Sequence, residues 1–194
     1  LKLLDGRVDG SGSGDQVKVT GGEVVRGNGS LESGNHFADP TGTYTLTYEN
    51  SNDVEAGPEY DSNNSKLGAL TFAGSGTVTL PSSETVTSGN DLEIEDGATV
   101  ASDGNTVTVA NFGEDGTPLT ANGSFTGSGE IQVNASSDNT YTLSGSGSVS
   151  TLKTNATDTD AEVSLGLSAT VDSLVADGSN GTLRVPEDGL SQIG

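Results

Sequence analysis

Oxygen-bearing side chains alternate with glycine near the start of the chain, in Asp9-Gly-Ser11-Gly-Ser13-Gly14. Alternating oxygen ligands and a glycine at a sharp turn suit Ca²⁺, which takes about six to eight oxygen ligands. The twelfth position of such a loop would be Thr20, where a calcium loop needs a bidentate Glu. The segment therefore predicts either a calcium site at Asp9, Ser11 and Ser13 or a plain Gly-Ser turn.

A second acidic cluster holds Asp158, Asp160 and Glu162, with Asn155 beside it. Alternation along a strand would place the three carboxylates on one face, where they repel unless a cation or water relieves the charge. This cluster is a second candidate calcium site, and a solvated acidic loop is the alternative interpretation. Calcium is the one cofactor that the sequence suggests.

The chain contains acceptor motifs for N-linked glycans, of the form Asn-x-Ser or Asn-x-Thr. Several are expected by chance in a chain this rich in Asn, Ser and Thr, but together they are compatible with a glycosylated surface protein. The candidate residues are Asn28, Asn63, Asn122, Asn134, Asn155 and Asn180.

Candidates for catalysis are few, because there is no cysteine and His36, with Asp39 nearby, is the single histidine. Asp91, Glu93 and Glu95 alternate, so a strand would place them on one face. Two carboxylates about 5–9 Å apart can hydrolyse a glycosidic bond. A charged strand face that only keeps the chain soluble is the alternative, and we expect no enzyme.

Three tyrosines, Tyr44, Tyr48 and Tyr60, could offer a platform for a neutral sugar. Tyr44 and Tyr48 share strand parity, however, so they also suit a position in the core.

Short segments that alternate between apolar and hydroxyl residues must position these groups, among them Thr45–Tyr48, Thr77–Leu80, Thr106–Val109 and Ser148–Ser150. A period of two predicts strand faces, and the Gly, Ser, Asn and Asp clusters between them predict turns. No stretch carries apolar residues at helical spacing over three turns. The low hydrophobicity and high net charge favour disorder, but this patterning favours an ordered all-β chain.

The first third of the chain differs from the rest. It predicts short strands at Gln16–Val19 and Glu23–Arg26, a strand at Thr43–Glu49 and a long polar loop at Asn50–Ser65. Because no Lys or Arg occurs from Leu67 to Leu152, we place a boundary near residue 65. Residues 1–65 are then an N-terminal β segment or cap, and residues 66–194 a solenoid-like domain.

A repeat emerges beyond that boundary. Tyr141–Leu152 aligns with Val163–Leu174 at an offset of 22 residues, and the apolar positions of the two segments coincide. The same template occurs at Leu70–Val78, and a partial copy occurs at Gly127–Val133, 18 residues before its successor. A unit of two short strands around a small-residue corner cannot close its own core, so stacking of units predicts a continuous core.

Leu70–Leu80 and Tyr141–Leu152 resemble the coils of right-handed β-helices in autotransporter passenger domains, filamentous-haemagglutinin-type adhesins and phage tail appendages. The resemblance covers roughly Leu67–Val185 and implies a parallel β-solenoid on a surface-exposed protein. The spacing between Leu80 and Gly127 departs from it. The alternative fold is an antiparallel β-sandwich, because strands at this spacing with turn signals also suit that architecture.

The charge balance excludes several classes of protein. Lys and Arg total 7 against 28 for Asp and Glu, so the net charge of -21 leaves no basic patch for nucleic acid. The absence of cysteine excludes a disulfide framework, and no apolar run reaches the ~18–20 residues that a membrane helix needs. Self-repulsion weakens the compact state at low ionic strength and salt screens it, so we expect adaptation to saline surroundings.

Together these features predict a non-enzymatic extracellular structural or adhesive protein, a subunit of a surface filament, appendage or virion spike. Its expected partners are further copies of itself or other surface or virion proteins, with Leu1–Leu4 and a strand at Gly181–Val185 as the pairing edges. The alternative is a carbohydrate-binding or polysaccharide-hydrolysing β-helix module whose partners are glycans. A simple spacer or stalk is a third possibility.

Overall fold

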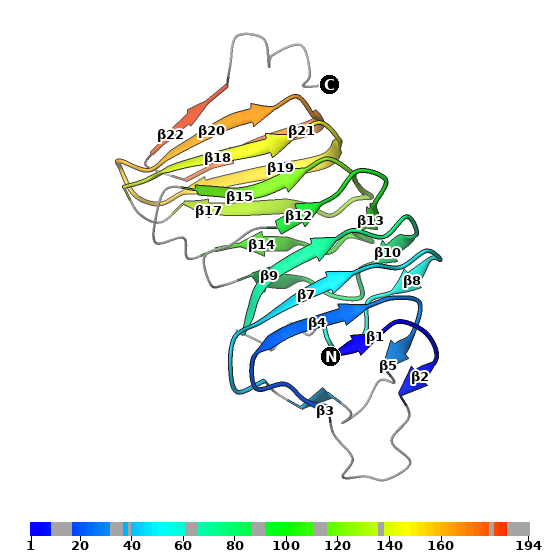
Figure 1. The fold of residues 1–194 in the computed structure, drawn as a ribbon. Helices are drawn as coiled ribbons and strands as arrows, with labels where there is room; N and C mark the ends of the chain where they lie inside the picture. The colour runs from blue at the N-terminus through cyan, green and yellow to red at the C-terminus, as the bar shows by residue number, and fades with distance from the viewer. Residues whose placement is uncertain are drawn as a thin grey trace.

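A computed structural model describes residues 1–8, 17–31, 37–38, 40–60, 66–86, 92–110, 116–135, 138–178 and 181–185. These residues form no helix, and their strands stack in parallel as a β-solenoid (Figure 1). The parallel solenoid predicted from the sequence is confirmed. The antiparallel sandwich is wrong, because neighbouring strands come from successive turns and run in the same direction.

One long sheet runs the length of the solenoid and forms what we call its first face. Nine strands contribute one rung each, so the ladder passes from β7 to β9 across the boundary expected near residue 65. In spatial order they are β1 (Lys2–Leu3), β4 (Gly22–Arg26), β7 (Tyr44–Tyr48), β9 (Leu67–Phe72), β12 (Leu92–Ile94), β15 (Gly116–Ala121), β18 (Thr140–Gly145), β20 (Glu162–Leu167) and β22 (Thr182–Arg184).

A second sheet closes the other sides of the solenoid. Its second face contains β8 (Val54–Glu55), β10 (Thr77–Thr79), β13 (Thr99–Ala101) and β16 (Ser124–Thr126). Its third face contains β11 (Glu84–Val86), β14 (Val107–Val109) and β17 (Ile131–Ala135). The long strands β19 (Ser148–Ala156) and β21 (Thr170–Asp177) span both faces, because β19 pairs first with β16 and then with β17.

The register confirms the 22-residue repeat. The aligned apolar pairs are hydrogen-bonded neighbours: Tyr141 with Val163, Leu143 with Leu165, Val149 with Val171, and Leu152 with Leu174. The partial copy at Gly127–Val133 is wrong, because its 18-residue offset would pair Ile131 with Val149, whereas Ile131 pairs with Leu152. Its glycines lie at the corner between the second and third faces instead of the corner after the first.

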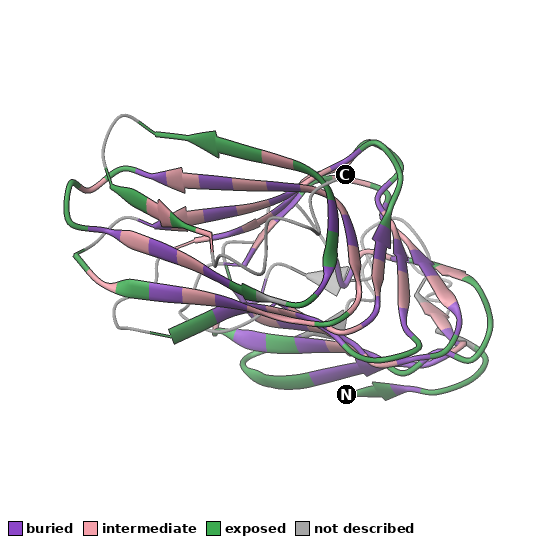
Figure 2. Cartoon of the chain, turned by 90° about the horizontal axis from the view of Figure 1, so that it is seen from above, coloured by how far each residue is buried: buried purple, intermediate pink, exposed green. Residues whose placement is uncertain are grey.

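The buried residues form one hydrophobic cluster, and along the strands they alternate with half-buried or exposed residues (Figure 2). Alternate residues of each strand point inward and stack on the equivalent residue of the next turn. On the second face this gives a column of Val78, Val100, Phe125, Val149 and Val171, each at most 4% exposed. Burial of such aliphatic and aromatic side chains contributes roughly 1.5–3 kcal/mol each, which is the main stabilising term here.

Glycine is required where successive turns approach closely at the corner after the first face. A Cβ built on Gly147 would lie 1.8 Å from the carbonyl oxygen of Gly123 in the turn before it. The same crowding occurs at Gly74, where a Cβ would lie 2.1 Å from the carbonyl oxygen of Asn50. The Gly-Ser corners of the repeat are therefore set by backbone stacking.

The N-terminal turns are less regular, as the sequence predicts. Of the strands that the structure describes, β2 (Arg7–Val8) pairs only with β5 (Ser30–Leu31), and β3 (Val17–Lys18) only with β6 (Phe37–Ala38), in two separate two-stranded sheets. Among the described strands, nothing pairs β5 with β8 on the second face. We call this interruption between Ser30–Leu31 and Val54–Glu55 the seam.

The long polar loop predicted at Asn50–Ser65 is wrong in its described part. It contains β8, and Ala56, Glu59 and Tyr60 are buried. The chain turns inward after β8 because Tyr60 and Ala56 add apolar surface to the core cluster. This inward turn places a carboxylate inside the solenoid.

Candidate functional site: a buried ion pair at the seam

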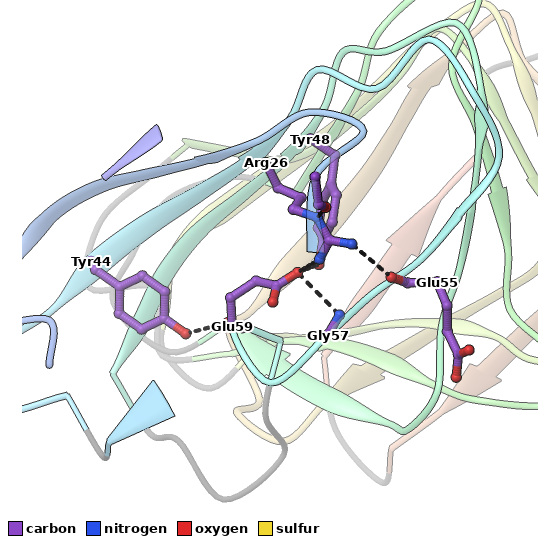
Figure 3. A network of polar contacts seen from close by, with 7 residues as sticks. Arg26, Tyr44, Tyr48, Glu55, Gly57 and Glu59 are labelled. Carbon is purple, nitrogen blue, oxygen red and sulfur yellow. Dashed lines mark hydrogen bonds and ion pairs between the residues drawn. The ribbon is translucent and has the colours of Figure 1, made fainter. Parts of the chain in front are cut away.

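An arginine and a glutamate meet inside the N-terminal turns (Figure 3). Arg26 is the last residue of β4 and its side chain is 4% exposed, while the side chain of Glu59 is fully buried. Arg26 Nη1 donates to Glu59 Oε1 in an ion pair. Because both charges are removed from water, each depends on the other for compensation.

Further donors converge on Glu59. Tyr48 Oη donates to Glu59 Oε1 at 3.2 Å, and the backbone N–H of Gly57 donates to the same oxygen at 3.0 Å. Tyr44 Oη donates to the carbonyl oxygen of Glu59 at 2.7 Å. Hydrogen bonds to a charged acceptor are stronger than those between neutral groups, so this shell fixes the carboxylate and the inward turn that carries it.

Arg26 also joins the two sides of the seam. Its Nε donates to the carbonyl oxygen of Gly29, next to β5, and its Nη2 lies 3.4 Å from the carbonyl oxygen of Glu55 in β8. The guanidinium therefore supplies donors to carbonyls on both sides of a gap where the backbone ladder is interrupted.

A pocket of about 460 Å³ lies at the seam. Arg26 forms part of its wall, and the other lining residues are Asn28, Ser30, Val54, Glu55, Ala56, Gly57 and Pro58. The amide of Asn28 is engaged in the corner, since Oδ1 accepts from the N–H groups of Ser51 and Asn52, both at 3.0 Å. Its Nδ2 donates to Ser51 Oγ at 3.0 Å.

Some buried polar atoms near the pair have no hydrogen-bond partner, namely Glu59 Oε2, Tyr60 Oη and Asn50 Oδ1. Burial raises the pKa of the Tyr48 phenol well above its ordinary value, and the charge of Glu59 adds to this while Arg26 opposes it. Burial also raises the pKa of Tyr60, with the charge of Glu84 as a second cause. Both phenols are therefore held in the neutral form.

The arrangement resembles internal bracing more than a reaction centre. The acid and the base are buried and bonded to each other, and the carboxylate accepts from a phenol and a backbone N–H. Sequence reasoning missed this pair. The sequence feature that could have pointed to the pair is Arg26 directly after two valines at the end of a strand, and this feature does not identify Glu59 as the partner.

The described residues include one of the two predicted calcium clusters. Asp9, Ser11 and Ser13 lie outside the described residues. Asp158 and Asp160 do not share a strand face with Glu162 but lie in a turn, in agreement with the alternative interpretation of an acidic loop, and Asp158 Oδ1 accepts from the N–H of Asp160 at 3.1 Å. Glu162 begins β20, and its Oε1 lies 2.7 Å from Arg184 Nε.

No group of three His, Cys, Asp or Glu side chains that could hold a metal ion occurs in the part of the chain that the structure describes. In the cluster around Asp158, the Asp158 carboxylate accepts from the backbone of its own turn and Glu162 is paired with Arg184, so these two carboxylates are engaged separately.

The described glycan acceptor motifs lie on outward or corner positions. Asn122 Oδ1 accepts from the N–H of Ser146 at 3.3 Å, and Asn134 Oδ1 accepts from Gln132 Nε2 at 2.7 Å. Asn155 lies in register between Asn134 and Asp177 on the third face. Asn28 is engaged as described above, and Asn63 and Asn180 lie outside the described residues. Glycosylation stays a prediction.

Most of the candidates for catalysis lie outside the described residues, whereas the candidates for sugar binding are described and buried. His36, Asp39 and Asp91 lie outside the described residues, while Glu93 is half-buried in β12 and Glu95 is exposed after it. The sugar platform is wrong, because Tyr44, Tyr48 and Tyr60 are each at most 1% exposed. The core position suggested by the parity of Tyr44 and Tyr48 is confirmed.

Comparison with protein-family models, with curated proteins and with solved structures finds no match to this chain. Within the described residues, no helix has the length and apolar character needed to cross a membrane.

Proposed function

We propose that this chain is a non-enzymatic structural or adhesive element, a subunit of a surface filament, appendage or virion spike outside the cell. The observation that supports this is the first face, a parallel ladder of nine strands from β1 to β22. A stacked ladder gives a stiff rod whose length grows with the number of turns, which suits a part that spans distance.

End-to-end association of copies is part of this proposal. Among the described strands of the first face, β1 pairs only with β4 and β22 only with β20. Unpaired strand edges are templates for another chain. The exposed large apolar side chains among the described residues also lie on the end turns: Leu1 and Leu4 beside β1, and Val175 in β21.

Negative-stain electron microscopy and light scattering of the purified chain in molar NaCl test this function. We expect regular fibres from the parent chain and discrete particles from Leu183→Pro, because proline removes a donor from the edge strand. Thr71→Lys, in the middle of the first face, is the matched control and should still assemble. Discrete monomers from the parent chain at every salt concentration would contradict association.

A second candidate function is binding of a neutral carbohydrate, favoured by the pocket at the seam. Its wall combines apolar groups of Val54, Ala56 and Pro58 with polar groups of Ser30 and Glu55. Sugars present both kinds of surface, and such mixed walls suit them. A glycan panel with the parent chain and with Ser30→Phe, which would fill the pocket, tests this candidate by loss of binding in the variant.

A further inference from the structure

The second face carries outward hydroxyl groups in register. We use the name hydroxyl face for the outward residues of β10, β13, β16 and the start of β19: Thr77, Thr79, Thr99, Ala101, Ser124, Thr126 and Ser148. Thr77, Thr99, Ser124 and Ser148 form one column, which continues to Thr170 in β21. Five successive turns thus present a hydroxyl at the same position.

The backbone holds this column at a regular spacing. Parallel neighbours in a sheet lie about 4.7–4.9 Å apart, so the Cα atoms of one column repeat at that distance, while the spacing of the hydroxyl oxygens also depends on the side-chain rotamers. The inward residues between the two columns are the buried Val78, Val100, Phe125 and Val149, which anchor each strand in the core. Ser148 Oγ donates to Ser124 Oγ at 3.0 Å, so neighbouring hydroxyls within the column are themselves hydrogen-bonded.

The hydroxyl face is uncharged in a chain with a net charge of -21. Charged residues return at its two ends, with Asp53 and Glu55 in or beside β8 and Asp172 in β21. The first face, by contrast, carries Glu93 at its centre. A face without charge or an aromatic ring favours a partner that is neutral and bound through hydrogen bonds.

Ordered water meets these requirements. Water molecules linked by O–H···O bonds of about 2.75 Å at tetrahedral angles place second-neighbour oxygens about 4.5 Å apart. This is close to the column spacing of about 4.7–4.9 Å set by the strands. Each hydroxyl offers one donor and two acceptor sites, so a column can bond to a row of lattice oxygens. The stiff χ1 of threonine reduces the entropy lost when the side chain is fixed.

We propose that the hydroxyl face binds the surface of ice, with the column Thr77, Thr99, Ser124, Ser148 and Thr170 aligned with a row of lattice oxygens. This activity is independent of association through the end strands.

Thermal hysteresis and partition into a growing ice hemisphere test the proposal, with circular dichroism melts to show that each variant folds. The parent chain should separate the melting and freezing points and enter the ice. Thr99→Lys and Ser124→Lys should each reduce hysteresis at least tenfold, because a lysine at mid-column holds the lattice away. Thr71→Lys on the first face, also half-buried and flanked in register by Thr47 and Glu93, should retain the parent activity.

The conservative variant Ser124→Thr distinguishes hydroxyl recognition from a loss of folding, because it keeps the hydroxyl and should keep hysteresis. Absence of hysteresis and of ice partition in the parent chain overturns the proposal, as does equal activity in Thr99→Lys. If the parent chain is retained on insoluble cellulose or chitin and shows no ice activity, the face binds a neutral polysaccharide and the ice-binding proposal is overturned. Fibres in electron micrographs report only on the proposed function, so the two failures are distinguishable.

Discussion

The charge of Glu59 is tolerated inside the solenoid because Arg26 accompanies it. Breaking a buried pair leaves an uncompensated charge, whereas replacing both partners by apolar residues is often neutral or stabilising. We expect Arg26→Met to lower the free energy of unfolding by about 3–5 kcal/mol. Arg26→Met with Glu59→Leu should recover most of that loss, as measured by denaturant unfolding in a double-mutant cycle. If the loss in the double variant equals the sum of the losses in Arg26→Met and Glu59→Leu, the two side chains are not coupled and the prediction is contradicted.

Gly147 lies where the corners of two successive turns approach closely, and we expect that no larger residue is tolerated there. In Gly147→Ala the new methyl meets the carbonyl oxygen of Gly123, which belongs to backbone and cannot move alone. We expect a loss of about 2–3 kcal/mol or more, since overpacking here displaces a whole turn. Gly166→Ala is the control: its Cβ would lie 3.1 Å from Thr142 Cγ2 and 3.3 Å from the carbonyl oxygen of Leu143, so a shift of a few tenths of an ångström relieves both contacts and its effect should stay at ~1 kcal/mol. Thermal melts of both variants provide the comparison.

The buried phenols predict how the fold responds to alkali. Burial raises the folded-state pKa of Tyr48 and Tyr60 above the ordinary value of 10.0. Their contribution to stability is therefore fully present below pH ~10 and is lost as the pH rises toward the folded-state pKa, because the unfolded chain ionises first. Tyrosinate absorbance should appear together with unfolding.

Tyr60→Phe sharpens this test, since Tyr60 Oη has no hydrogen-bond partner to lose. The variant should keep the neutral-pH stability of the parent chain and unfold at a higher pH. An unchanged alkaline midpoint would show that Tyr60 does not contribute to alkaline unfolding.

At the scale of elements, the register makes one turn a removable unit. Leu143 pairs with Leu165, so deletion of Leu143–Ser164 joins Thr142 to a residue in the equivalent position. We expect a shorter solenoid that still unfolds cooperatively, with a melting temperature lowered by a few degrees because one nearest-neighbour interface is lost. Deletion of Leu143–Lys153 removes half a turn and moves core residues out of register, so this variant should not fold. Circular dichroism melts compare the two.

The elements that sequence reasoning predicted are those whose signal is local. Tyr141–Leu152 and Val163–Leu174 align because inward positions repeat on the next turn, and the strand at Glu23–Arg26 follows from its own apolar residues. The buried pair at the seam could not be predicted, because Ala56–Tyr60 reads as a polar turn and only the tertiary fold brings Glu59 to Arg26. At Asp158–Glu162 the sequence leaves a strand face and an acidic loop both open, because alternation over five residues does not separate the two, and the backbone makes a turn.

At the scale of the whole molecule, salt should stabilise the fold. Between Leu67 and Leu152 the chain has no Lys or Arg, so the acidic side chains of the central turns repel one another without compensation. The screening length falls from about 10 Å at 0.1 M salt to about 3 Å at 1 M. We expect the melting temperature in calorimetry to rise by several degrees from low to molar NaCl.

Choline chloride should act like NaCl if screening is the cause, which separates it from specific binding of sodium. A melting temperature that does not change with either salt would show that self-repulsion is a minor term in the stability of this chain.

The seam has a mechanical consequence. Between the second and third turns, the described strands of the first face continue their ladder through β4 and β7, while those of the second face do not connect β5 to β8. Among the described residues, the contacts that carry tension along the solenoid axis at this joint include one backbone ladder, the corner bonds of Asn28 and the guanidinium of Arg26. The first two turns are therefore where a pulled rod should yield first, sparing the fully laddered turns above them.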